Sequence, residues 1–221
     1  MEVNVMQDIL GKNDALAEAM KSDFAARRIF VLNLMGSPGS GKTTLLEATL
    51  RALAGELRIA VIEGDLFTSK DADRIGACGA QVVQINTAGG CHLDAPMVEK
   101  ALKSLDLDAL DLIVIENVGN LVCPAEFALG EDAKAVVLSV TEGDDKPMKY
   151  PLMFKESSVA LLNKTDLLPF TNFDLVQASE DIRTIHPGAE VLPISATKGD
   201  GMGVWFEWLR AKVKAKKDGA A

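Results

Sequence analysis

The stretch GSPGSGKT, residues 36–43, decides the fold expected of this chain. It matches the pattern G-x-x-x-x-G-K-[ST] in full. An apolar run, residues 29–35, precedes it, and a helical pattern opens at about Lys42. Glycines let the backbone turn so tightly that successive N–H groups point at phosphate oxygens, and a helix N-terminus adds its positive dipole end. The stretch therefore predicts a phosphate-binding loop between a strand and a helix.

The residues of this loop have distinct predicted roles. We expect the Lys42 ammonium to reach the β- and γ-phosphates and to act in catalysis, and the Thr43 hydroxyl to bind Mg²⁺. A glycine-rich turn without a ligand is the alternative. The other predicted nucleotide contacts in and beside the loop are Gly36, Ser37, Gly39, Ser40, Gly41 and Thr44.

Short apolar runs alternate with amphipathic helical patterns along the rest of the chain. The runs are rich in Val, Ile and Leu and show little alternation, as is typical of strands buried on both faces. They cover residues 29–35, 58–63, 81–86, 112–116, 135–140, 158–163 and 190–195. Helical patterns cover residues 43–54, 94–105, 173–185 and 203–217, and an extra N-terminal helix is expected at roughly 12–27. The order predicts the α/β fold of P-loop NTPases, with a mostly parallel central sheet flanked by helices on both faces.

Composition excludes several classes of function. The net charge is −9, which argues against nucleic acid as a partner because a phosphate backbone favours a basic surface. We expect the basic C-terminal cluster, residues 210–217, to be a solvated last helical turn. The sequence contains no run of 18 apolar residues, so we expect no membrane span, and the first residues show no signal peptide. Three cysteines do not make a disulfide framework, so a reducing cytoplasm is expected.

NKTD, residues 163–166, fits the guanine-reading pattern N-K-x-D at the end of an expected strand. Guanine presents two parallel donors, N1–H and the N2 amino group, and the Asp166 carboxylate can accept both. The Lys164 stem can lie over the ring while Asn163 braces the loop. A helix N-cap at Asp166 is the alternative. After a phosphate loop, the pattern predicts GTP rather than ATP.

ISATKG, residues 194–199, falls at the end of the next expected strand. It resembles the last guanine-contacting loop of GTPases, and an ordinary turn is the alternative. We expect Ser195 and the backbone N–H near Ala196 to contact the base, with the N–H meeting its carbonyl oxygen. Residues 1–221 are therefore expected to form a single GTP-binding domain, with residues 1–28 as a helical extension packed on it.

Two acids and a glycine are the expected switch residues. Residues 116–119 stand where most GTPases have Asp-x-x-Gly: Glu116 is the acid for the Mg²⁺ shell, and the Gly119 N–H senses the γ-phosphate. Asp65 follows the second expected strand and could hold a Mg²⁺-bound water or orient the attacking water. A helix cap or surface carboxylate is the alternative for Asp65. Asn120, not Gln, follows the glycine, so slow GTP turnover is our hypothesis.

GGCHLD, residues 89–94, places Cys91 beside His92, one of two histidines in the chain. Cys91 precedes an expected helix start at Asp94, where a thiol tends toward thiolate. Cys123 follows another expected strand, and the exits of parallel strands share one rim. The three side chains can therefore converge beside the γ-phosphate-sensing loop. Two thiolates and an imidazole suit Zn²⁺ or Ni²⁺ better than Mg²⁺, and a purely structural role is the alternative. Cys78 is expected to be a small core residue and His186 a plain helix-end residue.

Six motifs together resemble the HypB family of GTPases, which help to insert nickel into [NiFe]-hydrogenase. They are MGSPGSGKTTLLE (35–47), EGD (63–65), NTAGGCHLDAPMV (86–98), IENVGNLVCPAEF (115–127), TEGDDKPMKYP (141–151) and NKTDLLP (163–169). The resemblance covers about residues 12–213. It implies a fold of the SIMIBI class, GTP-promoted homodimerisation, and a nickel or zinc site at the dimer interface with Cys91, His92 and Cys123 as ligands. Many members carry an N-terminal C-x-x-C-G-C motif or a histidine-rich tract, and this sequence has neither. Nickel storage and a second, tight N-terminal site are therefore not expected unless a separate protein or a missing segment supplies them.

The function that the resemblance implies is a GTP-hydrolysing nickel metallochaperone whose metal site responds to the nucleotide. A HypA-like nickel-binding protein and the hydrogenase large-subunit precursor are the implied partners. Lys146 or Lys149 could reach the nucleotide across the dimer, with a solvated loop as the alternative. Three other functions remain open: a nickel or zinc buffer whose GTP controls assembly only, a signalling GTPase with structural zinc, and a urease-type nickel GTPase. The last uses a Cys-Pro-His run, whereas Ala125 follows Cys123-Pro124 here.

Overall fold

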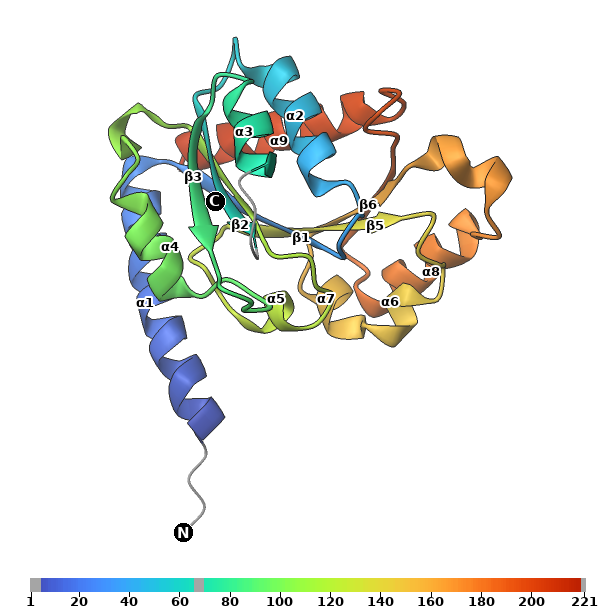
Figure 1. Cartoon of the computed structure of the whole chain (residues 1–221), viewed down its shortest axis with the longest axis horizontal. Coiled ribbons are helices and arrows are strands. Elements are labelled where there is room, and N and C mark those ends of the chain that lie inside the picture. The colour runs from blue at the N-terminus through green and yellow to red at the C-terminus, as the bar shows by residue number, and fades with distance from the viewer. Residues whose placement is uncertain (1–4, 66–69, 220–221) are drawn as a thin grey trace.

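One parallel sheet organises residues 5–65 and 70–219, which the computed structural model describes (Figure 1). Its seven strands lie in the order β3-β2-β4-β1-β5-β6-β7, and every neighbouring pair is parallel. The strands are β1 (Phe30–Gly36), β2 (Ile59–Asp65), β3 (Gln81–Asn86), β4 (Leu112–Glu116), β5 (Ala133–Ser139), β6 (Val159–Asn163) and β7 (Glu190–Pro193). All seven expected strands are present: β3 and β4 have the expected bounds, and the ends of the others differ by at most two residues.

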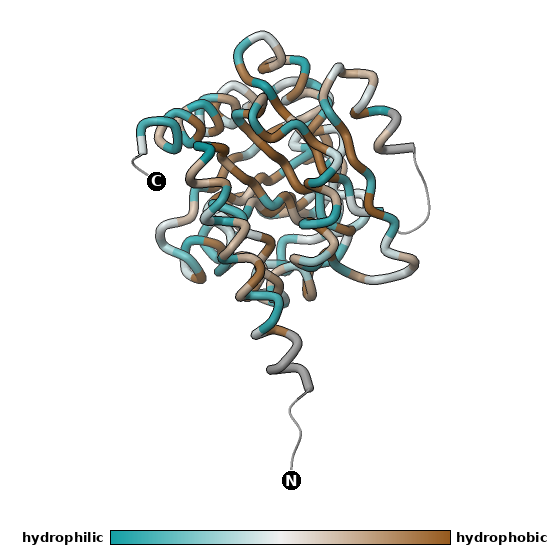
Figure 2. The backbone as a smooth tube through the Cα atoms, turned by 90° about the vertical axis from the view of Figure 1, so that its left-hand side faces the viewer, coloured by the Kyte–Doolittle hydropathy of each residue, from teal (hydrophilic) through white to brown (hydrophobic). Residues whose placement is uncertain are grey.

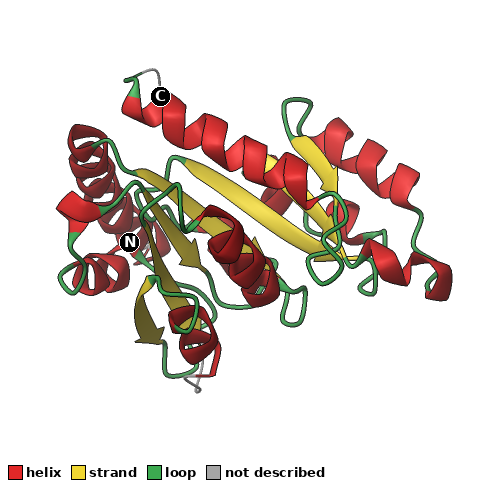
Figure 3. Ribbon diagram, turned by 90° about the horizontal axis from the view of Figure 1, so that it is seen from above, coloured by secondary structure: helices red, strands yellow, loops and turns green. Residues whose placement is uncertain are grey.

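Helices cover both faces of this sheet (Figures 1 and 3). One face carries α2 (Lys42–Leu53), α3 (Lys70–Gly76) and α9 (Met202–Lys217). The other carries α1 (Val5–Arg27), α4 (Ala95–Leu102), α5 (Cys123–Glu126), α6 (Lys146–Lys149), α7 (Pro151–Lys155) and α8 (Leu175–Ile185). Short 3₁₀ helices span Leu107–Ala109 and Thr165–Phe170. The α/β fold predicted from the alternating pattern is confirmed.

Burial on both faces explains why polar and apolar residues do not alternate along the central strands. In β1, Phe30, Leu32 and Leu34 pack with α2 and α9, whereas Val31 packs with α1 and α4. Figure 2 shows the hydrophobic segments gathered in the strands at the centre of the molecule. Each such side chain contributes roughly 1.5–3 kcal/mol when fully buried. The expectation of two buried faces is wrong for β3 and β7, because both are edge strands. The ends of β3 and of β7 are exposed, and the middle of β3 is half-buried.

The N-terminal helix α1 packs against α4 through Phe24 and Met20. It already includes Val5, so it starts earlier than the expected residue 12, and residues 1–4 of the expected extension lie outside the described chain. Asn13 ties α1 to the sheet rim: its Nδ2 donates to the Ala128 carbonyl at 2.9 Å, and its Oδ1 accepts from the first N–H of α4 at 2.8 Å. Neither α1 nor any other described helix is long and apolar enough to cross a membrane.

The basic C-terminal end is only partly solvated, which corrects the expectation from sequence. The Lys216 side chain is 4% exposed and its Nζ lies 2.6 Å from Asp132 Oδ1. Lys217 Nζ lies 2.9 Å from Asp111 Oδ1. The hydrogen-bonded Arg58 guanidinium, together with Lys217, holds the pKa of the Asp111 carboxyl well below its usual range. These ion pairs fasten the last turns of α9 to the edge of the sheet where the strands begin.

Candidate nucleotide and metal site

The phosphate loop joins β1 to α2 and needs glycine at its two ends. Gly36 has a φ of 151° and Gly41 a φ of 100°, a region that side chains disfavour. A Cβ at Gly36 would lie 2.5 Å from the Val137 carbonyl oxygen, and one at Gly41 would lie 2.4 Å from Asn163 Nδ2. Lys42 is buried, and its Nζ donates to the carbonyl oxygens of Gly36 at 3.2 Å and Ser37 at 3.3 Å. The loop thus forms a narrow cradle with an ammonium at its floor.

A cavity of about 410 Å³ opens beside this loop. Its lining includes Lys42 and all three residues predicted to hold Mg²⁺, namely Thr43, Asp65 and Glu116. The Thr43 hydroxyl donates to Glu116 Oε1 at 2.9 Å. A hydroxyl beside carboxylate oxygens is the hard, oxygen-only donor set that Mg²⁺ prefers, so the residues present fit that ion. Thr44 and Gly39 also line the cavity.

The predicted switch glycine lies across the phosphate loop. Gly119 lines the same cavity, and a Cβ on it would lie 2.8 Å from the Pro38 nitrogen. Any larger residue would push the segment after β4 away from the loop. The structure thus places Gly119 where its chain can respond to what occupies the cavity.

Three residues near the cavity were missed from sequence. Arg74 of α3 and the buried Glu63 of β2 line it, and Arg74 Nη2 lies 2.8 Å from Glu47 Oε2. Glu142 accepts a hydrogen bond from the hydroxyl of Ser37 in the phosphate loop, and its other oxygen accepts from the Ser139 backbone at 3.0 Å. Glu63 and Glu142 lie within the motifs EGD (63–65) and TEGDDKPMKYP (141–151), which were the only available signal for them, and Arg74 lies outside every motif.

Asn163 braces the N-K-x-D loop, residues 163–166, which we predict to read guanine. Its Nδ2 donates to the Ser40 carbonyl at 2.9 Å, and its Oδ1 accepts from the backbone N–H groups of Lys164 at 2.8 Å and Ala196 at 3.1 Å. The Ala196 N–H, expected to meet the base carbonyl, is therefore bonded to Asn163 in this structure. Lys164 adopts a φ of 64°, and its Nζ donates to the Gly39 carbonyl at 2.6 Å.

Asp166 lies beside the loop that follows β7. The Ser195 hydroxyl donates to Asp166 Oδ1 at 2.6 Å, and the Ile194 carbonyl accepts from the Thr165 backbone at 3.1 Å. Two segments about 30 residues apart in sequence are therefore joined next to the phosphate loop. Their contact holds the carboxylate that we predict to read guanine.

The three predicted soft ligands converge at the rim of the sheet. The ligand atoms of Cys91, His92 and Cys123 all lie within 4.8 Å of one another. The two Sγ atoms are 3.2 Å apart, and Cys91 Sγ lies 3.6 Å from His92 Nδ1. Donors on a tetrahedron around one ion at Zn–S distances lie about 3.8 Å apart, so this spacing suits a single ion. Two sulfurs and one imidazole fit nickel or zinc.

Local structure holds these ligands in place. Cys91 and His92 precede α4, whose N-cap Asp94 accepts from the Met97 backbone at 2.9 Å, and Cys123 is the first residue of α5. The His92 ring stacks on Phe127 with centroids 3.9 Å apart. The hydrogen bond to Cys91, together with partial burial, raises the pKa of the Cys123 thiol. Metal binding would therefore have to displace a proton from this thiol.

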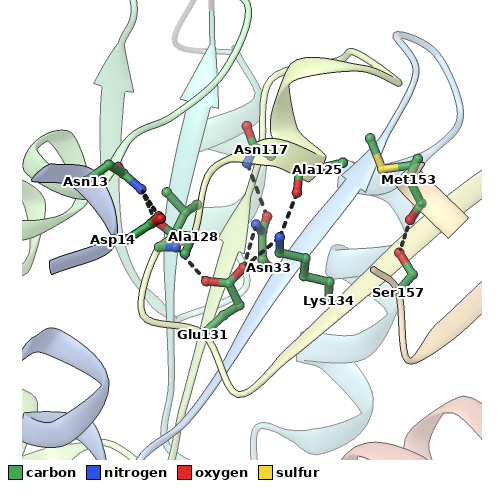
Figure 4. A network of polar contacts seen from close by, with 11 residues as sticks. Asn13, Asp14, Asn33, Asn117, Ala125, Ala128, Glu131, Lys134, Met153 and Ser157 are labelled. Atoms are coloured by element: carbon green, nitrogen blue, oxygen red, sulfur yellow. Dashed lines mark hydrogen bonds and ion pairs between the residues drawn. The ribbon is translucent and has the colours of Figure 1, made fainter. Parts of the chain in front are cut away.

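A buried polar network lies beneath this rim (Figure 4). Asn117 Nδ2 donates to Asn33 Oδ1 at 3.2 Å, and Asn33 Nδ2 donates to Glu131 Oε1 at 3.3 Å. Asn117 Oδ1 accepts from the backbone N–H of Leu93 at 3.2 Å. Lys134 continues the network by donating to the Ala125 carbonyl at 2.9 Å. Because buried polar groups are costly unless they are paired, this network fixes the loops on either side of the metal ligands.

Four residues given secondary roles are also placed. Cys78 is half-buried against the core, and His186 Nδ1 lies 3.0 Å from the Ser157 carbonyl oxygen at the end of α8. Lys146 and Lys149 are the ends of α6, so their segment is helical rather than a solvated loop. Lys149 pairs with Asp145 one turn earlier. Among the residues that the structure describes as lining the phosphate cavity, neither lysine is present, and Lys146 lines a neighbouring pocket with Ser37 and Gly119.

Comparison with known proteins agrees with this geometry. The CobW/HypB/UreG, nucleotide-binding domain family matches residues 30–193. The hydrogenase maturation factor HypB of Escherichia coli K12 is 53% identical over 212 residues, which cover 96% of this chain and 72% of that protein.

Two solved structures are also similar. HypB from Helicobacter pylori in complex with nickel has a TM-score of 0.86 at 39% identity, covering 94% of this chain and 96% of that one. The hydrogenase maturation factor HypB from Archaeoglobus fulgidus has a TM-score of 0.87 at 35% identity, covering 92% of this chain and 100% of that one. The family match extends from β1 through the phosphate loop and both cysteine-bearing loops to β7, so this chain belongs to the CobW/HypB/UreG family.

Proposed function

We propose that this chain is a GTP-hydrolysing nickel metallochaperone for [NiFe]-hydrogenase maturation. One observation carries the proposal: a single segment lines the phosphate cavity at Glu116 and Gly119 and supplies Cys123 to the Cys91–His92 cluster. The nickel complex of the Helicobacter pylori relative supports nickel as the cargo. Zinc is the competing ion for the same donors.

Each site residue has a proposed task in this function. Lys42 and the loop from Gly36 to Thr44 hold the phosphates, and Asp166 with Asn163, Lys164, Ser195 and Ala196 selects guanine. Thr43, Asp65 and Glu116 hold Mg²⁺, which neutralises charge on the phosphate oxygens when bound. Residues 1–221 act as one GTP-binding unit, with residues 1–28 as a helical extension packed on it.

Nucleotide and metal are coupled only if the two switch states coordinate nickel differently. GTP brings the Gly119 N–H to the γ-phosphate and closes a homodimer, and hydrolysis releases this segment. The Cys123 thiol lies on the same segment, so its distance from Cys91 and His92 changes with the nucleotide. Nickel then passes from a HypA-like protein through this chain to the hydrogenase large-subunit precursor in the cytoplasm.

Coupling predicts two different nickel affinities. The dissociation constant for nickel should differ about 5- to 150-fold between the GDP-bound protein and the protein bound to a non-hydrolysable GTP analogue, the usual range for linked sites. Isothermal titration of nickel into both complexes, with Mg²⁺ present, measures this ratio. Equal affinities would remove the coupling and leave a nickel buffer in which GTP controls assembly only. Single-turnover hydrolysis with nickel bound then tests whether GTP is consumed at all.

Replacing Cys123 with alanine should weaken nickel binding by more than the 10- to 100-fold typical of losing an outer-shell partner, because a ligand itself is lost. Guanine nucleotide affinity should stay at the wild-type value because Cys123 does not line the phosphate cavity. Cys78→Ala is the matched control: it removes a thiol that packs against the core and is not part of the cluster, and its nickel affinity should match wild type. Nickel binding that survives C123A would place the metal elsewhere. Loss of both nickel binding and guanine nucleotide binding would indicate that the fold was damaged.

A further inference from the structure

Asn120 lies between the nucleotide site and the metal site and contacts both. It directly follows Gly119, and it stands where a glutamine would position the attacking water in other GTPases. Its side chain is partly exposed and is turned toward the cysteine-bearing loops. This orientation gives the side chain a task other than holding water.

The main chain of Asn120 joins it to the phosphate loop. Its backbone N–H donates to the Gly36 carbonyl at 3.1 Å, and the two residues form an antiparallel bridge. The same carbonyl accepts from Lys42 Nζ at 3.2 Å. A phosphate in the cavity draws the Lys42 ammonium toward its oxygens. The Gly36 carbonyl then loses its hydrogen bond from Lys42, while it still accepts from the Asn120 N–H. The contact of Gly119 with Pro38 transmits any shift of the loop to the next residue in the chain.

The side chain of Asn120 joins both thiol-bearing loops. Its Nδ2 donates to the Cys91 carbonyl at 3.1 Å, and its Oδ1 accepts from the Val122 N–H at 3.0 Å, one residue before Cys123. A single planar amide therefore bridges the backbone of one ligand and the backbone beside the other. The distance between the two thiols depends on where this amide sits.

We propose that Asn120 is the positioning residue that transmits the state of the phosphate loop to the spacing of Cys91 and Cys123. This inference rests on the coupling in the proposed function. The buried Asn117 also lies near this route, but its bonds run to Asn33 and Leu93 inside the core. Asn120 differs because its own bonds reach the phosphate loop and the backbone of both thiol-bearing loops.

Asn120→Ala separates the two halves of this connection. It keeps the backbone N–H that bonds Gly36 and removes both side-chain bonds to the cysteine loops. The ratio of nickel dissociation constants between the GDP and GTP-analogue complexes should then fall toward one. Asn120→Asp is the second variant: it keeps an oxygen for the Val122 N–H but replaces the donor with an oxygen that faces the Cys91 carbonyl. It should lower the ratio as well. A purely structural role would weaken nickel binding equally in both complexes and leave the ratio unchanged.

Asn86→Ala is the matched control. Asn86 makes the same local bond, its Oδ1 accepting from the Ala88 N–H at 2.8 Å, and it lies on the Cys91 side of the rim. N86A should keep the wild-type ratio. The inference is overturned if N120A and N120D, shown by thermal unfolding to be folded, keep the wild-type ratio, or if N86A loses it to the same extent. A wild-type ratio of one would instead refute the proposed coupling itself, before any variant is compared.

Discussion

Replacing Lys42 with alanine should lower the rate of GTP hydrolysis by about 10²–10³-fold, the cost of removing one preorganised donor from a charged transition state. The Lys42 ammonium lies at the floor of the phosphate loop, held there by the carbonyl oxygens of Gly36 and Ser37. Charge grows on the phosphate oxygens during phosphoryl transfer, and a buried ammonium stabilises that charge more than an exposed one does. Release of inorganic phosphate under single-turnover conditions measures the rate.

Lys155→Ala is the matched control for this experiment, because it removes an exposed ammonium at the end of α7 that does not line the cavity. K155A should hydrolyse GTP at the wild-type rate. If K42A also did so while remaining folded, the ammonium would have no role in phosphoryl transfer, and the cavity beside it would not be the hydrolytic site.

Replacing Asp166 with asparagine should weaken GTP binding by about 10²–10⁴-fold. The carboxylate is placed to accept two parallel hydrogen bonds from guanine, and two charge-assisted bonds at roughly 1.5–3 kcal/mol each correspond to this loss. The Ser195 hydroxyl, 2.6 Å from Oδ1, orients the carboxylate before the base arrives. Equilibrium titration with a fluorescent guanine nucleotide measures the affinity.

Xanthosine triphosphate provides the control for this change. Xanthine carries a carbonyl oxygen where guanine carries its amino group, so the amide introduced by D166N can donate to it. The variant should therefore gain affinity for XTP while it loses affinity for GTP. Loss of affinity for both nucleotides would mean that the loop had collapsed, and unchanged GTP affinity would show that Asp166 does not read the base.

Local patterns were sufficient to predict most of the fold. The phosphate-loop motif and the runs of Val, Ile and Leu identified every described strand, because a strand buried on both faces needs apolar residues at every position. The exceptions have physical causes. The edge strands β3 and β7 have the apolar sequences of central strands although their ends are exposed. Lys216 was expected to be solvated, whereas it is buried against Asp132. Neither the edge position of a strand nor the pairing of Lys216 with Asp132 can be identified from local sequence.

The candidate site divides in a similar way. Residues within motifs of fixed spacing, such as Lys42 and Asp166, could be identified because the chemistry requires them at those positions. Arg74 and Glu142 could not. Arg74 belongs to no motif, and the motif TEGDDKPMKYP (141–151) does not show that the Glu142 side chain reaches Ser37 of the phosphate loop. The side chain of Asn120 was interpreted only by analogy with a water-positioning residue, whereas its bonds run to the cysteine-bearing loops.

The sequence by itself determined which residues can bind phosphate, guanine and a soft metal, because those capacities belong to the side chains and their local spacing. Only the tertiary structure decided that Cys91 and Cys123, 32 residues apart, lie 3.2 Å from each other. It also decided that one segment, from Glu116 to Cys123, serves both the phosphate cavity and the metal cluster. Parallel strands place their C-terminal ends at a common rim, and the order in which those strands pair depends on the packing of the whole sheet.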